Sequence, residues 1–215
     1  MGNAAAGADG VTGTAMAYDL RYSASPITDD AAFEAATRVT GVPAPKVSGS
    51  PESFVVMGLN PTTTYYFALK VIDKGNNRGP LSNSAGPATT TALLPISDLA
   101  AGTPTCSVVP LTWTAIDDGN IGQESSYDLR YSTSPITEGN FASATQVTGV
   151  PAPQPAGQAE SFRVRGLLGS TPYYFAIKGI DAYGHASPLS NIASATTAVT
   201  PHVSDLAGTA GSNKV

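Results

Sequence analysis

Hydrophobic and polar residues alternate along several short segments of this chain. In Tyr18–Tyr22 the two tyrosines and Leu20 are separated by Asp19 and Arg21, and Tyr127–Tyr131 repeats this order. Other residues with a period of two are Phe54 and Val56, followed by Tyr65, Phe67, Leu69 and Val71. A period of two predicts half-buried β-strands. Gly and Pro residues separate these segments at intervals of about 8–15 residues, which is typical of a β-sandwich.

The chain contains a long internal repeat. Tyr18–Ser23 returns as Tyr127–Ser132, 109 positions later (127 minus 18). Three more pairs of segments match in the same way: Glu52–Phe54 with Glu160–Phe162, Tyr65–Ala68 with Tyr173–Ala176, and Pro80–Asn83 with Pro188–Asn191. A period of this length corresponds to one small domain per repeat rather than to a solenoid.

The repeats predict the domain organisation. We expect one domain over residues 1–94, incomplete at its N-terminus, and a complete second domain over 95–200. Residues 201–215 are expected to begin a further repeat, because Val203–Ala207 matches Ile96–Ala100. The chain is long enough for two domains of common size, each with a core of its own.

One stretch in each repeat differs from the strand pattern and is predicted to be helical. These stretches are Thr28–Thr37 and Thr137–Thr145, and each follows the sequence Pro-Ile-Thr. We expect the threonine to cap the first turn. Phe33 and Phe141 are expected to pack inward from these turns.

The repeats resemble fibronectin type III domains of the kind found in bacterial secreted and cell-surface proteins. The second copy has the family's core tryptophan, Trp113, and both copies have its tyrosine corner, with Tyr65 and Tyr173. The corner motif has Gly169 in the second copy where the first has Pro61. The resemblance implies an all-β chain of two immunoglobulin-like sandwiches in tandem, with these three aromatic residues in the cores. It implies little about function, because this fold is a general scaffold.

Composition excludes several classes of function. Only 13% of the residues are charged, and the net charge is −5 without any cluster of Lys and Arg, so we expect no nucleic-acid partner. No apolar run reaches the roughly 18 residues that a membrane span needs. His185 and His202 fall in a loop and a linker, and no serine and carboxylate pattern accompanies them. We therefore predict no catalytic residues, no enzyme activity and no cofactor.

Carboxylates near the turns were considered as a calcium site. Asp117, Asp118 and Asp181 are expected at one pole of the second domain, but they lack the alternating acidic series that calcium loops carry. We predict ordinary turns there and no metal. On the first domain, the residues that alternate with the core positions are expected to form a solvated polar ladder, with a contact face as the alternative: Asp19, Arg21, Tyr66 and Lys70.

The first copy lacks the residues for its first two strands. In the second copy 30 residues (97 to 126) precede Tyr127, whereas only 17 precede Tyr18. Placing Ser204–Val215 before Met1–Ser23 gives 35 residues, against 36 for Ser97–Ser132. The two ends of the chain therefore join in register. In that composite, however, Gly2 and Ala4 replace the core residues Leu111 and Trp113, so the completed domain is under-packed unless another group fills the space.

This register predicts self-assembly. We expect the segment 203–215 to leave its own molecule, since a domain is about 30–40 Å long and reaching back past it would consume nearly all of the segment. It would then cover the open edge of the next subunit's first domain. The residues assigned to this contact are Val203, Ser204, Asp205, Leu206 and Val215 on the donor, with Glu52, Phe54 and Val56 on the receptor.

The function expected from the sequence is therefore that of a structural subunit. The chain would form an extracellular or cell-surface filament as a head-to-tail homopolymer, without inserting into a membrane. The alternative is a spacer or adhesion segment taken from a larger bacterial surface protein or secreted hydrolase. The sequence indicates no particular protein or glycan ligand.

Overall fold

The computed structural model describes residues 15–117, 124–202, 204, 206 and 207. It divides into two compact units, residues 1–92 (unit 1) and 93–215 (unit 2), each described by itself. The one α-helix in the described part has six residues and all longer elements are strands, so the all-β prediction is confirmed. The expected N-terminal gap of unit 1 and most of the expected donor segment lie outside the described residues.

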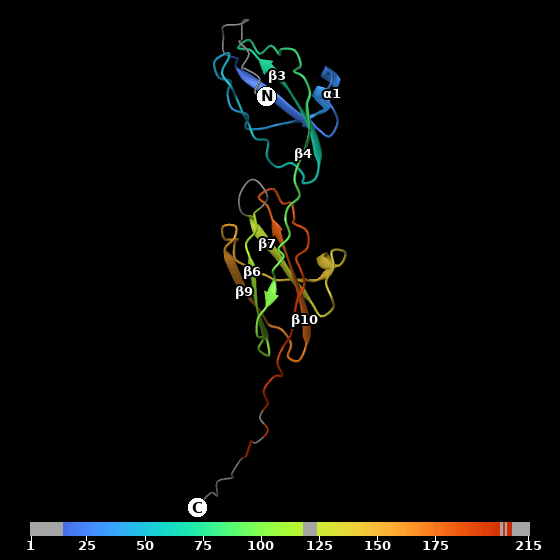
Figure 1. The fold of residues 1–215 in the computed structure, drawn as a ribbon, viewed down its shortest axis with the longest axis vertical. Helices are drawn as coiled ribbons and strands as arrows, with labels where there is room; N and C mark the ends of the chain where they lie inside the picture. Colours follow the sequence, from blue (N-terminus) through green and yellow to red (C-terminus); the bar gives the residue numbers. More distant parts are fainter. Residues whose placement is uncertain (1–14, 118–123, 203, 205, 208–215) are drawn as a thin grey trace, which may run out of the picture. The chain divides into compact units, whose positions relative to one another are not determined.

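Unit 2 is a sandwich of two antiparallel sheets (Figure 1). One sheet has the order β5-β6-β9 and the other has the order β11-β10-β7-β8. The strands are β5 Ala100–Ala101, β6 Val108–Thr114, β7 Ser126–Ser132, β8 Thr145–Gln146, β9 Ala159–Arg165, β10 Pro172–Ile180 and β11 Ala193–Thr196.

The core of unit 2 lies between the two sheets and follows the period-two pattern. In the β7–β10 pair Leu129 lies opposite Ile177, and in the β6–β9 pair Leu111 lies opposite Phe162. Alternate residues of a strand face the same side, so each pair contributes its apolar side chains to one interior. The fully buried members of this core are Ile96, Val109, Leu111, Leu129, Phe175 and Ile177.

Unit 1 has one four-stranded sheet in its described residues, with the order β2-β1-β3-β4. The strands are β1 Ala17–Ser23, β2 Thr37–Arg38, β3 Thr64–Ile72 and β4 Ala85–Thr89. Leu20 lies opposite Leu69, as Leu129 lies opposite Ile177 in unit 2. Residues 52–57, expected to be a strand, form none in the structure. A strand needs a hydrogen-bonded neighbour, and the described part of unit 1 supplies none at this position.

The short helical turns are shorter than expected and are capped differently. In unit 1 the helix α1 covers Asp30–Ala35, and the Asp29 side chain, rather than Thr28, accepts the N–H of Ala32. An aspartate at the N-cap satisfies a free backbone donor and suits the positive end of the helix. The corresponding turn in unit 2 is the 3₁₀ helix η1, Phe141–Ser143. Phe33 and Phe141 are both buried, as expected.

Candidate self-assembly site

The same apolar side chains are covered to different degrees in the two units. In unit 2, Leu129, Phe175 and Ile177 are completely buried between the sheets. Their repeat counterparts in unit 1, Leu20, Phe67 and Leu69, are only partly buried. The large inter-sheet cluster of unit 2 has no counterpart among the buried clusters formed by the described residues of unit 1. The inner face of the unit 1 sheet is therefore incompletely covered.

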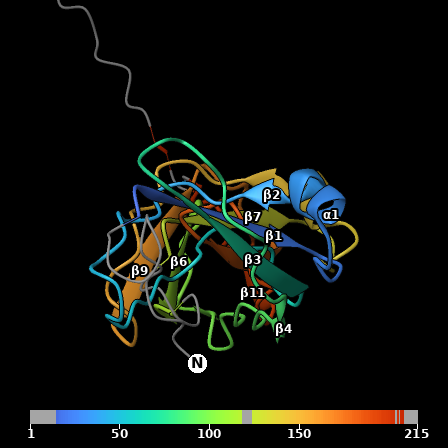
Figure 2. The same ribbon diagram turned by 90° about the horizontal axis from the view of Figure 1, so that it is seen from above.

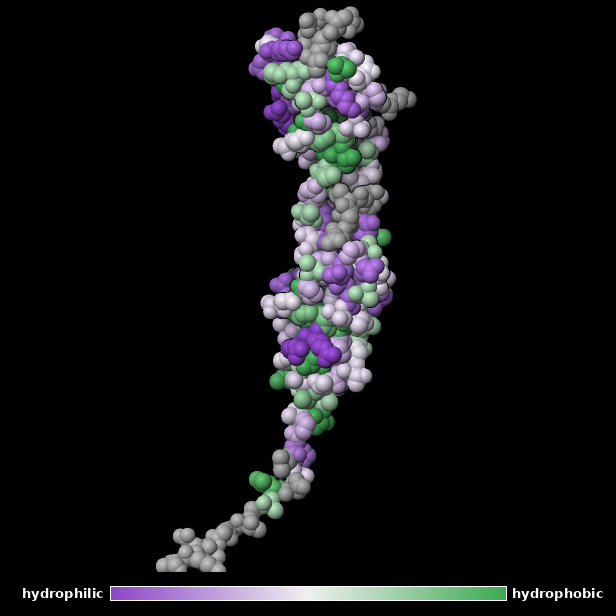
Figure 3. All heavy atoms as spheres, turned by 90° about the vertical axis from the view of Figure 1, so that its left-hand side faces the viewer, coloured by the Kyte–Doolittle hydropathy of each residue, from purple (hydrophilic) through white to green (hydrophobic). Residues whose placement is uncertain are grey.

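The receptor segment 52–57 exposes apolar side chains. Phe54 is 40% exposed, Val55 69% and Met57 51%, while Val56 is partly buried. In unit 2 the counterpart of Val56 is Val164, which is 2% exposed. Figure 3 shows that apolar atoms reach the surface of unit 1 among hydrophilic side chains. Exposed apolar side chains on a segment that has no strand partner among the described residues are a typical place for another chain to bind.

Glu52 holds this segment against the sheet. The Tyr18 hydroxyl donates to Glu52 Oε1 at 2.9 Å, and the N–H of Lys46 donates to the same oxygen at 3.0 Å. Burial, together with the hydrogen bond and charge of Glu52, raises the pKa of Tyr18 to about 12. Unit 2 has the same pair, with Tyr127 donating to Glu160 at 3.4 Å. The receptor segment is thus fixed at one end, although its backbone makes no sheet.

The donor residues in the described part of the chain are exposed. Ser204 is exposed and Leu206 is 91% exposed, whereas Leu99, the repeat counterpart of Leu206, is 3% exposed in the core of unit 2. Val203, Asp205 and Val215 lie outside the described residues.

In unit 2 the segment 96–100, which is the repeat counterpart of the donor residues 203–207, is held by several hydrogen bonds. Asp98 accepts the backbone N–H and the hydroxyl of Thr114, at 3.0 and 2.6 Å. The Thr114 hydroxyl holds the pKa of Asp98 below its ordinary value. Behind the strand, the Asn191 side chain bonds both the N–H and the carbonyl of Leu99. Side chains on both neighbouring elements therefore fix this segment in register.

The three residues assigned to the cores are buried. Trp113 is 2% exposed and its ring meets that of Tyr127 edge-on, with ring centroids 5.3 Å apart. Tyr65 accepts the backbone N–H of Asn60 at 3.1 Å, and Tyr173 accepts that of Leu168 at 3.0 Å. Each corner tyrosine thus buries its ring while its hydroxyl keeps a hydrogen bond.

The polar ladder expected on the outer face of unit 1 is not solvated. Asp19 is completely buried, and Arg21 and Lys70 are 9% and 7% exposed. The Phe33 ring lies against the two cations, with the Arg21 guanidinium 4.7 Å and the Lys70 ammonium 5.2 Å from the ring centre. Alternation assigned these residues to the outer face but could not show that a helical turn covers it. Figure 2 shows α1 beside β1 and β2.

Charge complementarity makes this burial possible. The Asp19 carboxylate binds three arginines: Arg21 at 3.1 Å, Arg38 at 3.4 Å and Arg78 at 2.5 Å. Arg21 also donates to the carbonyls of Phe33 and Glu34. Sequence comparison of the copies carried a signal for this cluster, because Arg38 and Arg78 are replaced by Gln146 and Ala186 in unit 2.

The structure brings together two of the candidate catalytic and metal-binding residues, His185 and Asp181. His185 Nδ1 lies 2.7 Å from Asp181 Oδ2, and His202 is exposed. Burial raises the pKa of Asp181, but the hydrogen bonds from His185 and Tyr183 outweigh it and hold that pKa below its ordinary value. Within the described ranges no three His, Cys, Asp or Glu side chains form a possible metal site, and Asp118 falls outside those ranges.

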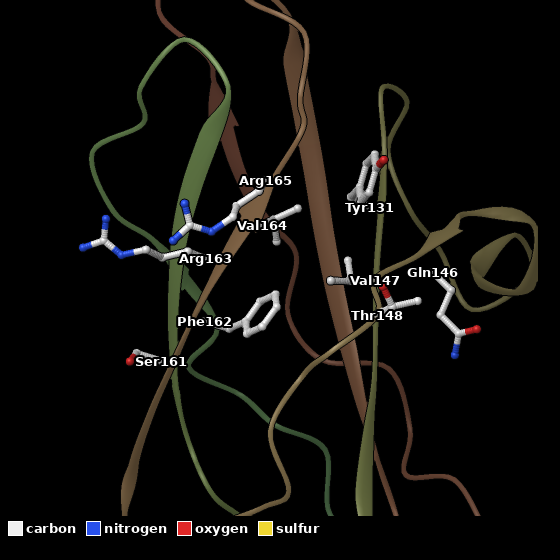
Figure 4. A pocket seen from close by; sticks show the side chains of 9 residues that line it. All are labelled: Tyr131, Gln146, Val147, Thr148, Ser161, Phe162, Arg163, Val164 and Arg165. Carbon is white, nitrogen blue, oxygen red and sulfur yellow. The ribbon is translucent and has the colours of Figure 1, made fainter.

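Unit 2 has a groove along the open side of its sandwich, with a volume of about 630 Å³. Figure 4 shows Phe162 and Val147 facing one another across it, while Arg163 and Arg165 point to the other side of β9. The counterparts of these arginines in unit 1 are Val55 and Met57. The outward positions of this segment are therefore charged in unit 2 and apolar in unit 1.

No helix in the described residues is long and apolar enough to cross a membrane.

Unit 2 has one sheet of three strands and one sheet of four strands. An arrangement of three strands facing four is that of an immunoglobulin-like β-sandwich. The chain is similar to the FN1–FN3 domains of chicken CNTN1, with 16% identity and a TM-score of 0.38, over 84% of this chain and about half (53%) of that one. It is also similar to the sixth fibronectin type III domain of human fibronectin type III domain containing protein 3, with 16% identity, a TM-score of 0.37, and 56% and 99% of the two chains covered.

A third similar structure is titin module A71 from human cardiac muscle, with 18% identity and a TM-score of 0.36, over 48% of this chain and 89% of that one. No family model and no curated protein matches the chain. At these identities and TM-scores the likeness does not assign the chain to a family.

Proposed function

We propose that this chain is a non-enzymatic structural subunit of an extracellular filament. In this filament, residues 203–215 of one copy lie in unit 1 of the next and complete its sandwich. The contact joins two different surfaces, the donor segment of one copy and unit 1 of the next. Such a contact does not close on itself, so it produces an open filament. The resemblance to domains of secreted and surface proteins favours a location outside the cell.

The exposure of Leu206 carries this proposal. It is 91% exposed, while the same position of the preceding repeat, Leu99, is 3% exposed within a core. Burying a leucine side chain stabilises a protein by about 1.5–3 kcal/mol. A receiving surface with open apolar positions therefore gains free energy by taking up Leu206.

Unit 1 offers a receiving surface of the required kind. Its sheet has the same register as that of unit 2, yet Leu20, Phe67 and Leu69 remain partly exposed. The segment 52–57 occupies the sequence position of β9, and β9 pairs with β6 in unit 2. An added strand would supply both the backbone partner and the apolar cover, as in β-augmentation.

The substitution Leu206→Asp tests the proposal. We expect the purified full chain to form fibres that electron microscopy and sedimentation detect, and the variant to remain monomeric, because a charge cannot enter the receptor core. Leu168→Asp is the matched control: Leu168 is 71% exposed outside the proposed contact, so this variant should polymerise normally.

Removal of residues 203–215 provides a second test. The truncated chain should be monomeric while unit 2 keeps its unfolding transition. Fibres from the truncated chain, or from Leu206→Asp, would exclude strand donation. A wild-type chain that stays monomeric at high concentration would instead favour the spacer or adhesion alternative.

A further inference from the structure

Asn191 binds both the N–H and the carbonyl of Leu99, the residue just before β5 of unit 2. Its side-chain oxygen accepts the N–H of Leu99 at 2.9 Å, and its side-chain nitrogen donates to the carbonyl of Leu99 at 2.8 Å. An amide side chain has one acceptor and one donor group, and both match one residue of an extended strand. Asn191 therefore selects the position of Leu99 along the sandwich.

Unit 1 holds an asparagine in the same local geometry. In unit 2 the Ser190 hydroxyl accepts the N–H of Ile177 at 3.0 Å and donates to the Asn191 carbonyl at 2.7 Å. In unit 1 the Ser82 hydroxyl accepts the N–H of Leu69 at 3.0 Å and donates to the carbonyl of Asn83 at 2.8 Å. The serine fixes both loops to the sheet in the same way.

The strand that follows keeps this correspondence. Ala85 lies opposite Phe67 in unit 1, and Ala193 lies opposite Phe175 in unit 2. Asn83 and Asn191 thus precede matched positions by the same two residues. The extra residue of unit 1 comes only later, at the irregularity between Tyr65 and Phe67.

The side chain of Asn83 has no partner among the described residues. It is exposed, and only its main-chain carbonyl takes part in a hydrogen bond. At the matching position of unit 1, the side chain of Asn83 therefore binds no described strand in the way that Asn191 binds Leu99. The repeat counterpart of Leu99 is Leu206, which is itself exposed.

We infer that Asn83 is the residue that fixes the register of the incoming strand, by bonding the N–H and the carbonyl of Leu206 from a second copy of this chain. The inference rests on the proposed function and names the polar contact that accompanies burial of the Leu206 side chain. The apolar face favours any hydrophobic strand, whereas two backbone bonds to one residue select a single register. Asn83 is thus a positioning residue for assembly.

The test is the concentration needed for assembly of the full chain, measured by sedimentation. Asn83→Ala loses two hydrogen bonds to the donor strand, so we expect this concentration to rise about tenfold or more. Asn83→Asp keeps an acceptor but sets a carboxylate against the Leu206 carbonyl, and its defect should be larger. Thermal unfolding of the unassembled variants should match the wild type, because the Asn83 side chain has no hydrogen bond to lose within the described residues.

The matched variant Asn191→Ala should behave in the opposite way. It should lower the unfolding temperature of unit 2, because the two hydrogen bonds from Asn191 to Leu99 are intramolecular. Wild-type assembly by Asn83→Ala, in an experiment in which Leu206→Asp abolishes fibres, would overturn the role of Asn83 and leave strand donation standing. Wild-type assembly by Leu206→Asp would overturn strand donation itself.

Discussion

Unit 1 and unit 2 are two copies of one sequence pattern in which the stabilising contacts are distributed differently. Unit 2 has its large core between two sheets, where Leu129, Phe175 and Ile177 are completely buried. In unit 1 the Asp19 carboxylate is completely buried on the outer face of the sheet, where it binds three arginines. Its counterpart, Asp128, is 19% exposed in its side chain and binds Arg130 and Gln146.

The difference shows that strand pairing and core formation are separable properties of this sequence. The pairs Leu20–Leu69 and Leu129–Ile177 form in both units, since each needs only its own two strands. Complete burial of the same side chains requires a second sheet. The additional arginines of unit 1, Arg38 in β2 and Arg78 in the loop after β3, bind Asp19 of β1 in the one sheet that the described part of unit 1 contains.

The largest effect is expected from Asp19→Ala. This change removes the buried carboxylate that Arg21, Arg38 and Arg78 share and leaves Arg21 only the half-exposed Glu34, so the free energy of unfolding of unit 1 should fall by about 3–5 kcal/mol. Asp128→Ala should cost about 1 kcal/mol or less, because that pair is accessible to water. Chemical denaturation with separate probes for the two units measures both. Equal losses in the two variants would show that Asp19 has no special role.

The second-largest effect is expected in the core of unit 2. Leu129→Ala should lower the free energy of unfolding of unit 2 by about 2–5 kcal/mol, because it leaves a cavity in a packed core. Leu20→Ala in the unassembled chain should cost less, since Leu20 is already partly in water. If the two substitutions are equally damaging in the monomer, the face of unit 1 is already covered and needs no donor strand.

The smallest effect concerns the hydrogen bond between Tyr18 and Glu52. Glu52→Gln should lower the pKa of Tyr18 from about 12, although burial, the largest contribution, should keep it above 10. The pKa of Tyr127, raised to about 12 chiefly by burial, should not change. Alkaline titration followed by tyrosine absorbance distinguishes the two groups. An unaltered Tyr18 titration would show that Glu52 makes no hydrogen bond there in solution.

These raised pKa values also predict how stability depends on pH. Because the folded-state pKa lies above the ordinary value of 10, each tyrosine contributes stability that is fully present below pH 10. This contribution is lost as the pH rises towards 12. Tyr18→Phe and Tyr127→Phe should each remove the corresponding alkaline loss in their own unit.

Much of the fold followed from local sequence. Alternation around Leu20 and Leu129 predicted the strands β1 and β7, and the corner motifs predicted the buried Tyr65 and Tyr173, because each pattern is carried by residues close together in the chain. The residue that caps α1 was wrongly predicted, since Thr28 and Asp29 are adjacent and both can cap a helix.

The environment of the outer face could not be predicted in this way. Alternation gives the side of the sheet on which Asp19 lies, but its surroundings include Arg38 and Arg78, which come from two segments far along the chain. Alternation could not predict the conformation of the segment 52–57 either, because a β-strand forms only when a partner strand is present. Asn83, in contrast, could have been singled out by its repeat match with Asn191.

The dependence of α1 on the sheet has a consequence for local opening motions. A helix of six residues is too short to persist alone, and here Arg21 of β1 holds its last carbonyls while Lys70 of β3 binds Asp30 near its start. Its amide hydrogens should therefore exchange with solvent only when those strands separate. In hydrogen-exchange measurements, the amide of Phe33 would report on the opening of the sheet rather than on fraying of the helix.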